Sequence, residues 1–424
     1  MIKILKYSDV NKDEIFARQI DSDNVEAIVA DIIADVKKNG DSALYKYAEK
    51  FDKAKLDTLL VTKEEIEEAV NSVDTEFIRI LKRAADNIRA FHQKQVRTSY
   101  IISEENGVVT GQKITPIDKV GLYVPGGTAA YPSTVLMDSI PAKIAGCEEV
   151  VMVSPPNSEG KINPVILAAA SVAGVDKIFK VGGAQAVAAL SYGTESIPKV
   201  DKIVGPGNKF VAEAKKQVFG LVSIDMIAGP SEILIIADGK TNPKYAAADL
   251  LSQAEHDKMA SAVLVTDSYE FAEKVSEELE KQIPQLERSE IARASIDNNG
   301  KIIVAENLDV AIEVSNEIAP EHLEICVDNP FDYLDKIKHA GSIFMGRNCP
   351  EALGDYMAGP NHTLPTSGTA RFSSPLSVDD FVKKSQYTYY TKDALKNIAY
   401  DVEYFATKEG LTAHAKSAVI RLEE

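Results

Sequence analysis

Apolar residues recur at helical spacing through most of the N-terminal quarter of the chain. Over residues 23–38 they lie three or four positions apart, and the same spacing returns over residues 80–91. Thr62 followed by Glu65 is a capping-box pattern, which predicts the start of a further helix. We therefore predict a short arm over residues 1–21 and a mainly helical region after it.

From Lys119 onward, short apolar runs alternate with helical patterns. We predict strands at 120–124, 149–153, 178–181, 201–204, 232–237, 261–266, 301–305, 322–327 and 341–345. Helical patterns lie near 163–173, 184–192, 208–219, 243–258, 269–281, 308–318 and 331–338. Strands that alternate with helices favour βαβ units on a parallel sheet. The expected fold is α/β, with two incomplete Rossmann-like lobes, an N-terminal helical arm and a small C-terminal helical unit.

Two stretches near the end of the chain depart from this alternation. Residues 346–377 are rich in Gly, Pro, Ser and Asn, and a polar stretch of this length is typical of a functional loop. The stretch from about Leu376 is acidic and aromatic, and we expect it to be helical toward its end. Residues 376–424 are too few to build a stable core unaided, so we expect them to dock on another surface.

Composition and charge exclude several classes of protein. Hydrophobic residues make up 45% of the 424 residues and charged residues 26%, which excludes disorder as a description of the whole chain. The net charge of −17 argues against binding to nucleic acid or to an anionic membrane. We see neither an apolar run long enough to cross a membrane nor a signal-peptide pattern. Three widely spaced cysteines, Cys147, Cys326 and Cys349, suit free thiols in the cytoplasm.

Two glycine-rich turns are candidates for anion binding. Gly205-Pro206-Gly207-Asn208 lies between a predicted strand and a predicted helix, where exposed backbone N–H groups suit a pyrophosphate. The match to G-x-G-x-x-G is partial because Phe210 takes the third glycine position, so a tight turn without a ligand is an equal alternative. Asp225 follows at the spacing of a ribose-binding acid, which chance also produces. Gly182-Gly183-Ala184-Gln185 is a second turn of this kind, and a structural role explains it as well.

Two pairs of polar residues could carry chemistry. Gln253 and His256 share one face of a predicted helix end and could hold a metal ion, although a half-buried polar helix end is the simpler explanation of the spacing alone. Glu321 and His322 are adjacent where a helix gives way to a strand, and they could divide acid and base roles. An isolated pair of this kind is more often an exposed turn.

The remaining candidates lie in the loop and the tail. The loop contains Asp355 and His362, and the last helical turns contain Glu409 and His414, for which a solvated tail is the plain alternative. A loop histidine such as His362 could merely hold its neighbours in place. The other histidines, His92 and His339, fall in helical patterns and are expected at the surface.

Taken together, these segments resemble the histidinol dehydrogenase family over nearly the whole chain. Any one motif would be weak, but the ordered set is highly specific. The stretches that carry the resemblance are Tyr123-Val124-Pro125-Gly126-Gly127, Gly182 to Ala186, Gly205 to Asn208, Ala228-Gly229-Pro230-Ser231-Glu232, Gln253 to His256, Ala319-Pro320-Glu321-His322-Leu323 and the loop 361–375.

The resemblance implies an NAD-dependent, zinc-containing homodimer that oxidises L-histidinol through L-histidinal to L-histidine. It implies a main domain of residues 22–122 plus 231–375 with the catalytic and metal residues, an NAD-binding domain of residues 123–230, and a tail domain of residues 376–424 that contributes to the partner subunit's site. The implied residues are Glu321 and His322 for catalysis; Gln253, His256, Asp355 and His414 for zinc; Tyr123, Gln185 and Asn208 for NAD; and Ser231, His322 and Glu409, with the zinc ligands, for substrate.

These roles agree with the chemistry of the side chains. An imidazole has a reference pKa near neutrality, so His322 can take the hydroxyl proton as the alcohol is oxidised. Oxidation of the aldehyde needs a water molecule, which Glu321 can activate. In the family the metal is thought to orient the substrate's imidazole and amine, and Glu409 could favour the substrate ammonium.

Three other functions are weighed against this one. A related dehydrogenase for another hydroxylated compound, such as a sulfonated diol, could keep the NAD and base residues but would have no use for Glu409 and the four zinc ligands. A zinc hydrolase could use Glu321 to activate a metal-bound water and would need no nicotinamide. A pure binding module has no use for an adjacent Glu–His pair beside a metal set.

Overall fold

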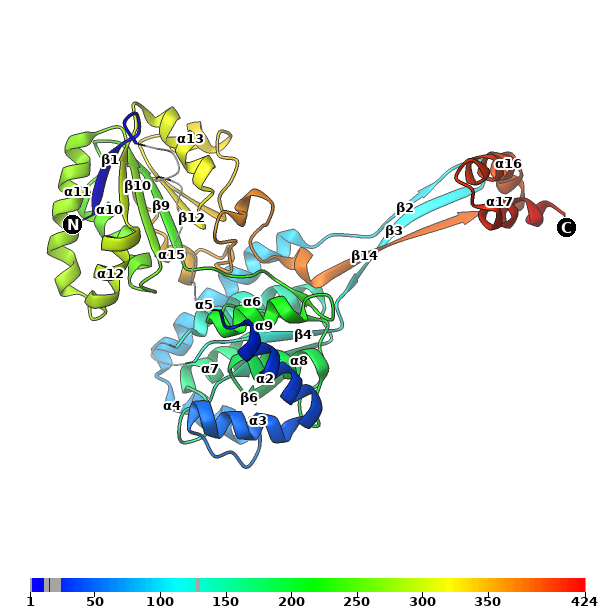
Figure 1. Ribbon diagram of the computed structural model, residues 1–424, viewed down its shortest axis with the longest axis horizontal. Helices are drawn as coiled ribbons and strands as arrows, with labels where there is room; N and C mark the ends of the chain where they lie inside the picture. Colours follow the sequence, from blue (N-terminus) through cyan, green and yellow to red (C-terminus); the bar gives the residue numbers. More distant parts are fainter. Residues whose placement is uncertain (1, 11–14, 16–23, 127–129, 424) are drawn as a thin grey trace. The chain divides into compact units, whose positions relative to one another are not determined.

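The structure is a computed structural model that describes residues 2–10, 15, 24–126 and 130–423 (Figure 1). Contacts between residues divide the chain into two compact units. Unit 1 contains residues 1–95 and 118–381, and unit 2 contains residues 96–117 and 382–424. Among the described residues, no helix is both long and apolar enough to cross a membrane.

Unit 1 contains a six-stranded parallel sheet, here called sheet A, in the order β1-β11-β10-β9-β12-β13. Its strands are β1 (Lys3–Lys6), β9 (Glu232–Ala237), β10 (Ser261–Thr266), β11 (Lys301–Val304), β12 (His322–Cys326) and β13 (Ser342–Met345). The helices of this region are α10 (Pro243–Ala254), α11 (Tyr269–Gln282), α12 (Ser289–Asn299), α13 (Leu308–Ile318), α14 (Phe331–Leu334) and α15 (Ala352–Tyr356). Apolar side chains fill both faces, because the strands alternate between a core shared with α10, α11 and α12 and a core shared with α13.

Unit 1 also contains a five-stranded parallel sheet, sheet B, in the order β6-β5-β4-β7-β8. Its strands are β4 (Lys119–Tyr123), β5 (Glu149–Ser154), β6 (Lys177–Lys180), β7 (Lys202–Val204) and β8 (Ser223–Ile224). The helices around it are α2 (Glu26–Asn39), α3 (Asp41–Tyr47), α4 (Lys63–Ser72), α5 (Thr75–His92), α6 (Pro132–Ala145), α7 (Pro164–Ala173), α8 (Gly183–Tyr192) and α9 (Lys209–Val218). Both sheets have the α/β architecture expected from the sequence.

The domain boundaries expected from the sequence are wrong in unit 1. Residues 22–122 were expected to join residues 231–375, but Val29 of α2 and Leu44 of α3 share their core with Val151 of β5. The helices that follow the arm therefore belong with sheet B. An amphipathic helix buries its apolar stripe on whichever sheet surface it reaches, and the stripe itself does not identify that sheet.

The N-terminal arm is only partly an arm. Residues 3–6 form β1, which pairs in parallel with β11 and completes the edge of sheet A. Most of the remaining arm lies outside the described residues. A strand of four residues is too short to produce a clear periodic pattern, so its pairing was not visible in the sequence.

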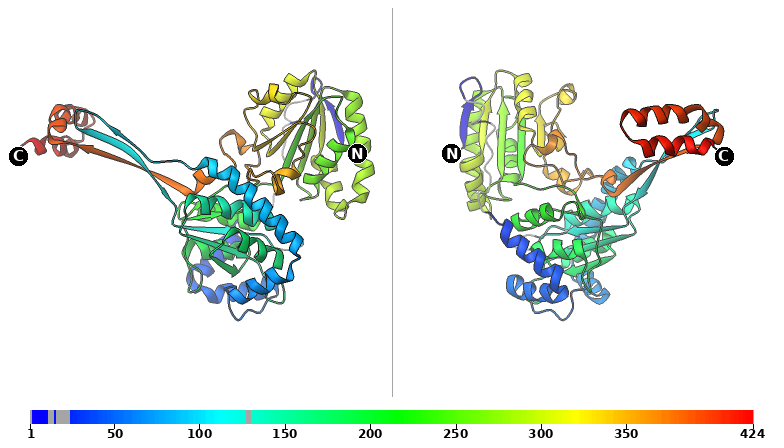
Figure 2. Two further views of the ribbon diagram at one scale, coloured as in Figure 1. Left: turned by 180° about the vertical axis from the view of Figure 1, so that it is seen from behind. Right: turned by 45° about the vertical axis from the view of Figure 1, so that its right-hand side comes forward.

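Unit 2 joins residues 382–424 to residues 96–117, so the tail domain expected over residues 376–424 is incomplete. Its sheet C has the antiparallel order β14-β3-β2, formed by β14 (Val382–Tyr390), β3 (Val108–Pro116) and β2 (Tyr100–Ser103). It also contains α16 (Lys392–Lys408) and α17 (Thr412–Val419), which pack side by side (Figure 2). The tail thus shares a sheet with residues 100–116. Because nearly every residue of β14 and β2 is exposed, these strands lack the alternation of buried and polar positions that reveals a strand.

Two local predictions have different outcomes. Thr62 accepts the N–H of Glu65 while the Glu65 carboxylate accepts the N–H of Thr62, which confirms the capping box at the start of α4. His92 was expected at the surface and is fully buried at the end of α5, where its Nδ1 lies 2.7 Å from Gln95 Oε1. Its spacing on the helix places it on the buried face with Ile88.

Candidate active site

A cavity of about 320 Å³ in unit 1 brings together side chains from sheet A and turns from sheet B. Ser231 precedes β9, and Glu321 and His322 stand at the start of β12, so the amino ends of these parallel strands form one wall. Turns after the carboxyl ends of β4, β7 and β8 form another. The sheet B residues are Pro125, Gly205, Pro206, Gly207, Asn208, Asp225 and Met226, and the metal candidates Gln253, His256 and Asp355 complete the lining.

His322 is buried and held in one orientation. Its Nδ1 lies 2.9 Å from the backbone carbonyl oxygen of Glu232, the residue that begins the neighbouring strand β9. Because a carbonyl oxygen can only accept, this contact assigns the proton of the neutral ring to Nδ1 and leaves a lone pair on Nε2. Nε2 is buried, and no described residue forms a hydrogen bond with it. The ring therefore offers a base to the cavity.

Carboxylates adjust the basicity of His322. Burial lowers the pKa of this imidazole, but the negative charges of Glu321, Glu351 and Asp355 outweigh burial, and the net shift of the pKa is upward. Glu321 Oε2 lies 3.5 Å from Nδ1, and Glu351 Oε1 lies 3.7 Å from Nε2. The ring can thus hold a proton more firmly than a histidine in water.

The neighbouring strand β9 positions Glu321 as well as His322. Its Oε2 accepts the backbone N–H of Glu232 at 2.8 Å, so the two catalytic candidates are fixed by the N–H and the C=O of one residue. Burial raises the pKa of Glu321 to about 7, against the opposing influence of His322. A carboxyl group with a pKa near neutrality can give and take a proton in the physiological range.

Gln253, His256 and Asp355 fit a metal ion. Gln253 is buried at the end of α10, where its amide lies close enough to the Glu351 side chain to interact with it, and its Oε1 forms no hydrogen bond with a described residue. A buried amide oxygen without a donor is costly unless a ligand pairs it, and this oxygen is a suitable metal donor. His256 and Asp355 line the same cavity, and burial lowers the pKa of His256, which favours the neutral, ligating form.

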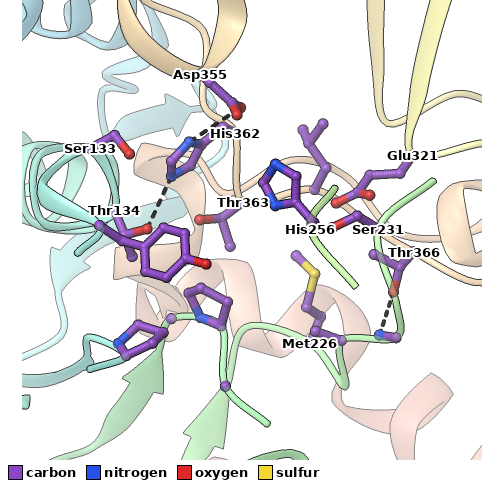
Figure 3. Close-up of a pocket in the computed structure, with 18 of the residues that line it drawn as sticks. Ser133, Thr134, Met226, Ser231, His256, Glu321, Asp355, His362, Thr363 and Thr366 are labelled. Carbon is purple, nitrogen blue, oxygen red and sulfur yellow. Dashed lines mark hydrogen bonds and ion pairs between the residues drawn. The ribbon is translucent and has the colours of Figure 1, made fainter. Parts of the chain in front are cut away.

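Sequence reasoning missed Glu351 and left His362 open. Carboxylate and ring atoms of His322, Glu351 and Asp355 all lie within 4.8 Å of one another, the spacing of a metal-binding group. His362 lies between two partners, with Nδ1 3.4 Å from Asp355 Oδ1 and Nε2 3.5 Å from Thr134 Oγ1 (Figure 3). A signal for Glu351 was present, because Glu351 and Asp355 are four residues apart, which is one turn of a helix.

Side chains near the ends of the strands of sheet B hold the glycine-rich turn at Gly205 in place. Asp225, at the spacing of a ribose-binding acid, instead accepts the N–H of Gly205 at 2.8 Å and forms a buried ion pair with Lys215. Asn208 lines the cavity and caps α9 through the N–H groups of Phe210 and Val211. Tyr123 and Gln185 are both buried, and neither is among the residues that line the cavity.

Glu409 and His414 belong to unit 2, whereas every lining residue of the cavity belongs to unit 1. Both residues are exposed, Glu409 at the end of α16 and His414 on α17. The structure thus brings together Ser231, Gln253, His256, Glu321, His322 and Asp355 in one cavity and leaves the two tail residues outside that group.

Comparison with known proteins supplies a further finding. Residues 16–422 match the family "Histidinol dehydrogenase". The chain is 59% identical to a histidinol dehydrogenase of Clostridium acetobutylicum, over 94% of this chain and 93% of that protein, and 56% identical to one of Lactococcus lactis, over 95% and 94%. A crystal structure of histidinol dehydrogenase from Elizabethkingia anophelis superposes with a TM-score of 0.95 at 40% identity, covering 100% of this chain and 98% of that one.

Proposed function

Because the chain belongs to the histidinol dehydrogenase family, we propose that its cavity carries out both oxidations of that reaction, with Glu321 and His322 as the catalytic pair. The reaction is the NAD-dependent oxidation of L-histidinol through L-histidinal to L-histidine, which ends histidine biosynthesis. The observation that carries the proposal is the buried Nε2 of His322, which forms no hydrogen bond with a described residue, in a cavity that Glu321 also lines.

The first oxidation requires a base for the substrate hydroxyl. His322 takes that proton on Nε2, and the resulting imidazolium is favoured by the carboxylates of Glu321 and Glu351. Its Nδ1–H remains on the Glu232 carbonyl oxygen, so the ring keeps its orientation while the charge changes. When bound, NAD accepts the hydride of each oxidation, and zinc orients the substrate's imidazole and amine.

The second oxidation requires water, because an aldehyde has no hydroxyl proton to lose. Glu321, in its ionised form, takes a proton from water as the water adds to the aldehyde carbon. His322 returns its proton to the aldehyde oxygen as the water adds, and it then takes the proton of the hydrated aldehyde as it took that of the alcohol. A pKa of about 7 suits Glu321 to this cycle, because the carboxyl group must also release its proton before the next turnover.

Gln253, His256, Asp355 and the tail residue His414 are proposed as the zinc ligands. The donor set of one amide oxygen, one carboxylate and two imidazoles is suitable for zinc and leaves room for substrate nitrogens. The unpaired Oε1 of Gln253 supports this assignment. The change His256→Asn should lower the zinc content of the purified protein strongly, and full zinc content would remove His256 from the ligand set.

Asn208, Tyr123 and Gln185 are proposed to contact NAD. Tyr123 ends β4, Gln185 lies in the first turn of α8, and Asn208 caps α9, so all three lie near the carboxyl ends of strands of sheet B, where α/β proteins bind nucleotides. Gly205 supports the proposal because a Cβ there would lie 2.2 Å from the backbone oxygen of Tyr123, so the turn is closed up against the end of β4. Ser231 is proposed to contact the substrate from the opposite wall of the cavity.

We propose that the active protein is a C2 homodimer in which each site receives Glu409 and His414 from the partner subunit. Unit 2 supports this proposal because it leaves many large apolar side chains exposed. They include Tyr100, Ile101, Ile102, Tyr389, Tyr400, Tyr404 and Phe405, each more than half exposed. A surface of this kind is typical of a region that another chain covers.

The reaction is tested by counting the NADH formed per L-histidinol consumed. Two equivalents with little free aldehyde are expected, because one catalytic pair serves both steps. One equivalent with accumulating histidinal would contradict the single-site proposal. Absence of NADH altogether would favour a zinc hydrolase instead.

Site sharing is tested by mixing two inactive chains, His256→Ala and His414→Ala. If sites are shared, a mixed dimer has one site with both changes and one with neither. Random pairing makes about half of the dimers mixed, so refolding a mixture should restore up to about a quarter of wild-type activity. No recovery, with mixed dimers shown to have formed, would place the tail on its own subunit's site.

A further inference from the structure

A second cavity, of about 350 Å³, lies in unit 1 beyond the carboxyl end of β5. Its walls include Pro155, Pro156 and Asn157, which follow that strand, and Asn163, which caps α7. The segment after β4 borders both cavities, because Pro125 lines the active-site cavity and the next residue, Gly126, lines this one. The two cavities are therefore neighbours along the carboxyl edge of sheet B.

The strand order of sheet B assigns parts of a dinucleotide to this edge. In the order β6-β5-β4-β7-β8, the first strand along the chain, β4, lies in the middle, with the second, β5, on one side and the fourth, β7, on the other. In doubly wound sheets a dinucleotide crosses the edge at such a switch point, with its pyrophosphate near the end of the first strand. With the reactive ring on the β7 side, the adenosine half lies over β5, where the second cavity is.

An acid normally receives the adenosine ribose at the end of the second strand. Here that position reads Ser154-Pro155-Pro156-Asn157 and contains no acid. Among the described residues that line this cavity, one carries a carboxylate: Asp52, which comes from a segment far from β5 in sequence.

The backbone holds Asp52 at this place. Residues 48–52 form a wide π-helical turn after α3, Lys53 follows in the left-handed conformation with φ 59°, and the Ala54 N–H returns to the Ala48 carbonyl oxygen at 3.2 Å. The chain then runs along the edge of sheet B, where the Lys180 N–H donates to Leu59 O at 2.8 Å. Asp52 is therefore anchored on both sides.

The Asp52 carboxylate has no partner that explains its position. Its Oδ2 is buried and forms no hydrogen bond with a described residue, and burial raises the pKa of this group to about 6. Among the described residues that line the cavity, Lys161 is the only one with a cationic side chain, and its ammonium is paired with Glu68 at 3.1 Å. A partly dehydrated carboxylate without donors is suited to a ligand that brings two hydroxyl groups, and it repels a phosphate.

We infer that Asp52 binds the ribose hydroxyls of the adenosine half of NAD in this cavity and thereby excludes the 2′-phosphate of NADP. The inference rests on the proposed function for its cofactor and adds to it the residue that selects between the two nicotinamide cofactors. Asp52 touches the cofactor far from the reacting atoms, so its effect is on binding and not on the chemical steps.

The test is calorimetric titration of the zinc-loaded protein with NAD and with NADP, for the wild type and for Asp52→Asn. The wild type should bind NAD more tightly than NADP. Asp52→Asn should weaken NAD binding by about tenfold, in line with the loss of a charge-assisted hydrogen bond, and bring the ratio of the two affinities close to one. Asp57→Asn, an exposed acid five positions along the chain, is the matched control and should change neither affinity.

Thermal unfolding without cofactor separates a binding role from a structural one. Because Asp52 is partly buried without a partner, Asp52→Asn should leave the melting temperature unchanged or raise it. A variant that melts earlier and loses cofactor affinity would overturn the inference, because the carboxylate would then be structural. An unchanged ratio of NAD to NADP affinity would also overturn it. If the wild type itself binds neither cofactor, the proposed function fails as well. Failure of the Asp52 inference alone is recognised because the wild type then still binds NAD.

Discussion

The two parallel sheets of unit 1 present opposite edges to one cavity. Sheet A contributes the amino ends of its strands, which carry ionisable side chains such as Glu321 and His322. Sheet B contributes the carboxyl ends, where the lining residues belong to turns such as Gly205-Pro206-Gly207. In the proposed function, proton transfer requires buried ionisable side chains, whereas cofactor binding requires tight turns, and the same parallel α/β architecture provides both.

The two walls of the cavity destabilise the fold in different ways. On sheet A, burial raises the pKa of Glu321 to about 7, so the ionised carboxylate destabilises the fold at the pH where it must work. On sheet B, the cost is conformational, because Gly205 has φ 112° and no room for a side chain. The following predictions test this division from the largest expected effect to the smallest.

The change His322→Gln should reduce the rates of both oxidations by about 10²–10⁴-fold, because the same base serves both steps. Cofactor affinity, which we propose depends on sheet B, should stay near the wild-type value. Stopped-flow measurement with histidinol and with histidinal checks the two rates separately. His339→Gln, which lies outside the cavity lining, is the control and should be active. A loss confined to one of the two steps would contradict the shared base.

The change Glu321→Gln should damage oxidation of histidinal far more than oxidation of histidinol. Only the second step adds water, and glutamine cannot accept the proton of that water. The Glu232 N–H can still donate to the new amide oxygen, so the local structure is expected to persist. Equal damage to both steps would remove the assignment of Glu321 as the group that activates water.

The same variant should show an opposite, pH-dependent effect on stability. The raised pKa means that the folded protein binds this proton more tightly than the unfolded chain, so the contribution of Glu321 to stability falls as pH rises from about 4.5 through about 7. Zinc-free Glu321→Gln should therefore exceed the wild type by at most about 3 kcal/mol at pH 8 and lose this advantage below pH 5. Urea unfolding at both values measures the difference, with exposed Glu313→Gln as the control.

On sheet B, Gly205→Ala should destabilise the protein by about 1–3 kcal/mol and weaken NAD binding. The added Cβ would lie 2.2 Å from the backbone oxygen of Tyr123, so the turn after β7 must shift. Gly220→Ala is a matched control, because its φ of 101° is similar and nothing lies within 4 Å of the new Cβ. If both variants lose NAD affinity equally, backbone strain and not the closed turn is the cause.

The smallest effect is expected from the cysteines. Aldehyde oxidation could pass through a covalent thiol adduct, but none of Cys147, Cys326 and Cys349 lines the cavity. Burial, together with the nearby Glu324, raises the pKa of Cys326, which makes this thiol a poor nucleophile. A variant with all three changed to Ala should keep most of the activity, and a loss traced to Cys349 alone would revive the covalent route.

The sequence was sufficient to predict those features that depend on residues close together in the chain. The alternation of apolar runs and helical patterns predicted the strands of both parallel sheets except the short β1 and β8, and the Thr62 capping box marked the start of α4. The adjacency of Glu321 and His322 and the spacing of Gln253 and His256 gave most of the sheet A wall, because the members of each pair are close in sequence. Their chemical role nevertheless depended on the resemblance to a family.

Tertiary structure decided what depends on contacts between distant segments. α2 and α3 pack against the core of sheet B, and β14 pairs with β3, because an apolar stripe or an exposed strand does not encode its partner. The proton on Nδ1 of His322 depends on the Glu232 carbonyl of another strand. Asp52 reaches the end of β5 only through a turn and an edge pairing. Burial and hydrogen bonding set these properties, and both depend on which segments meet in the folded chain.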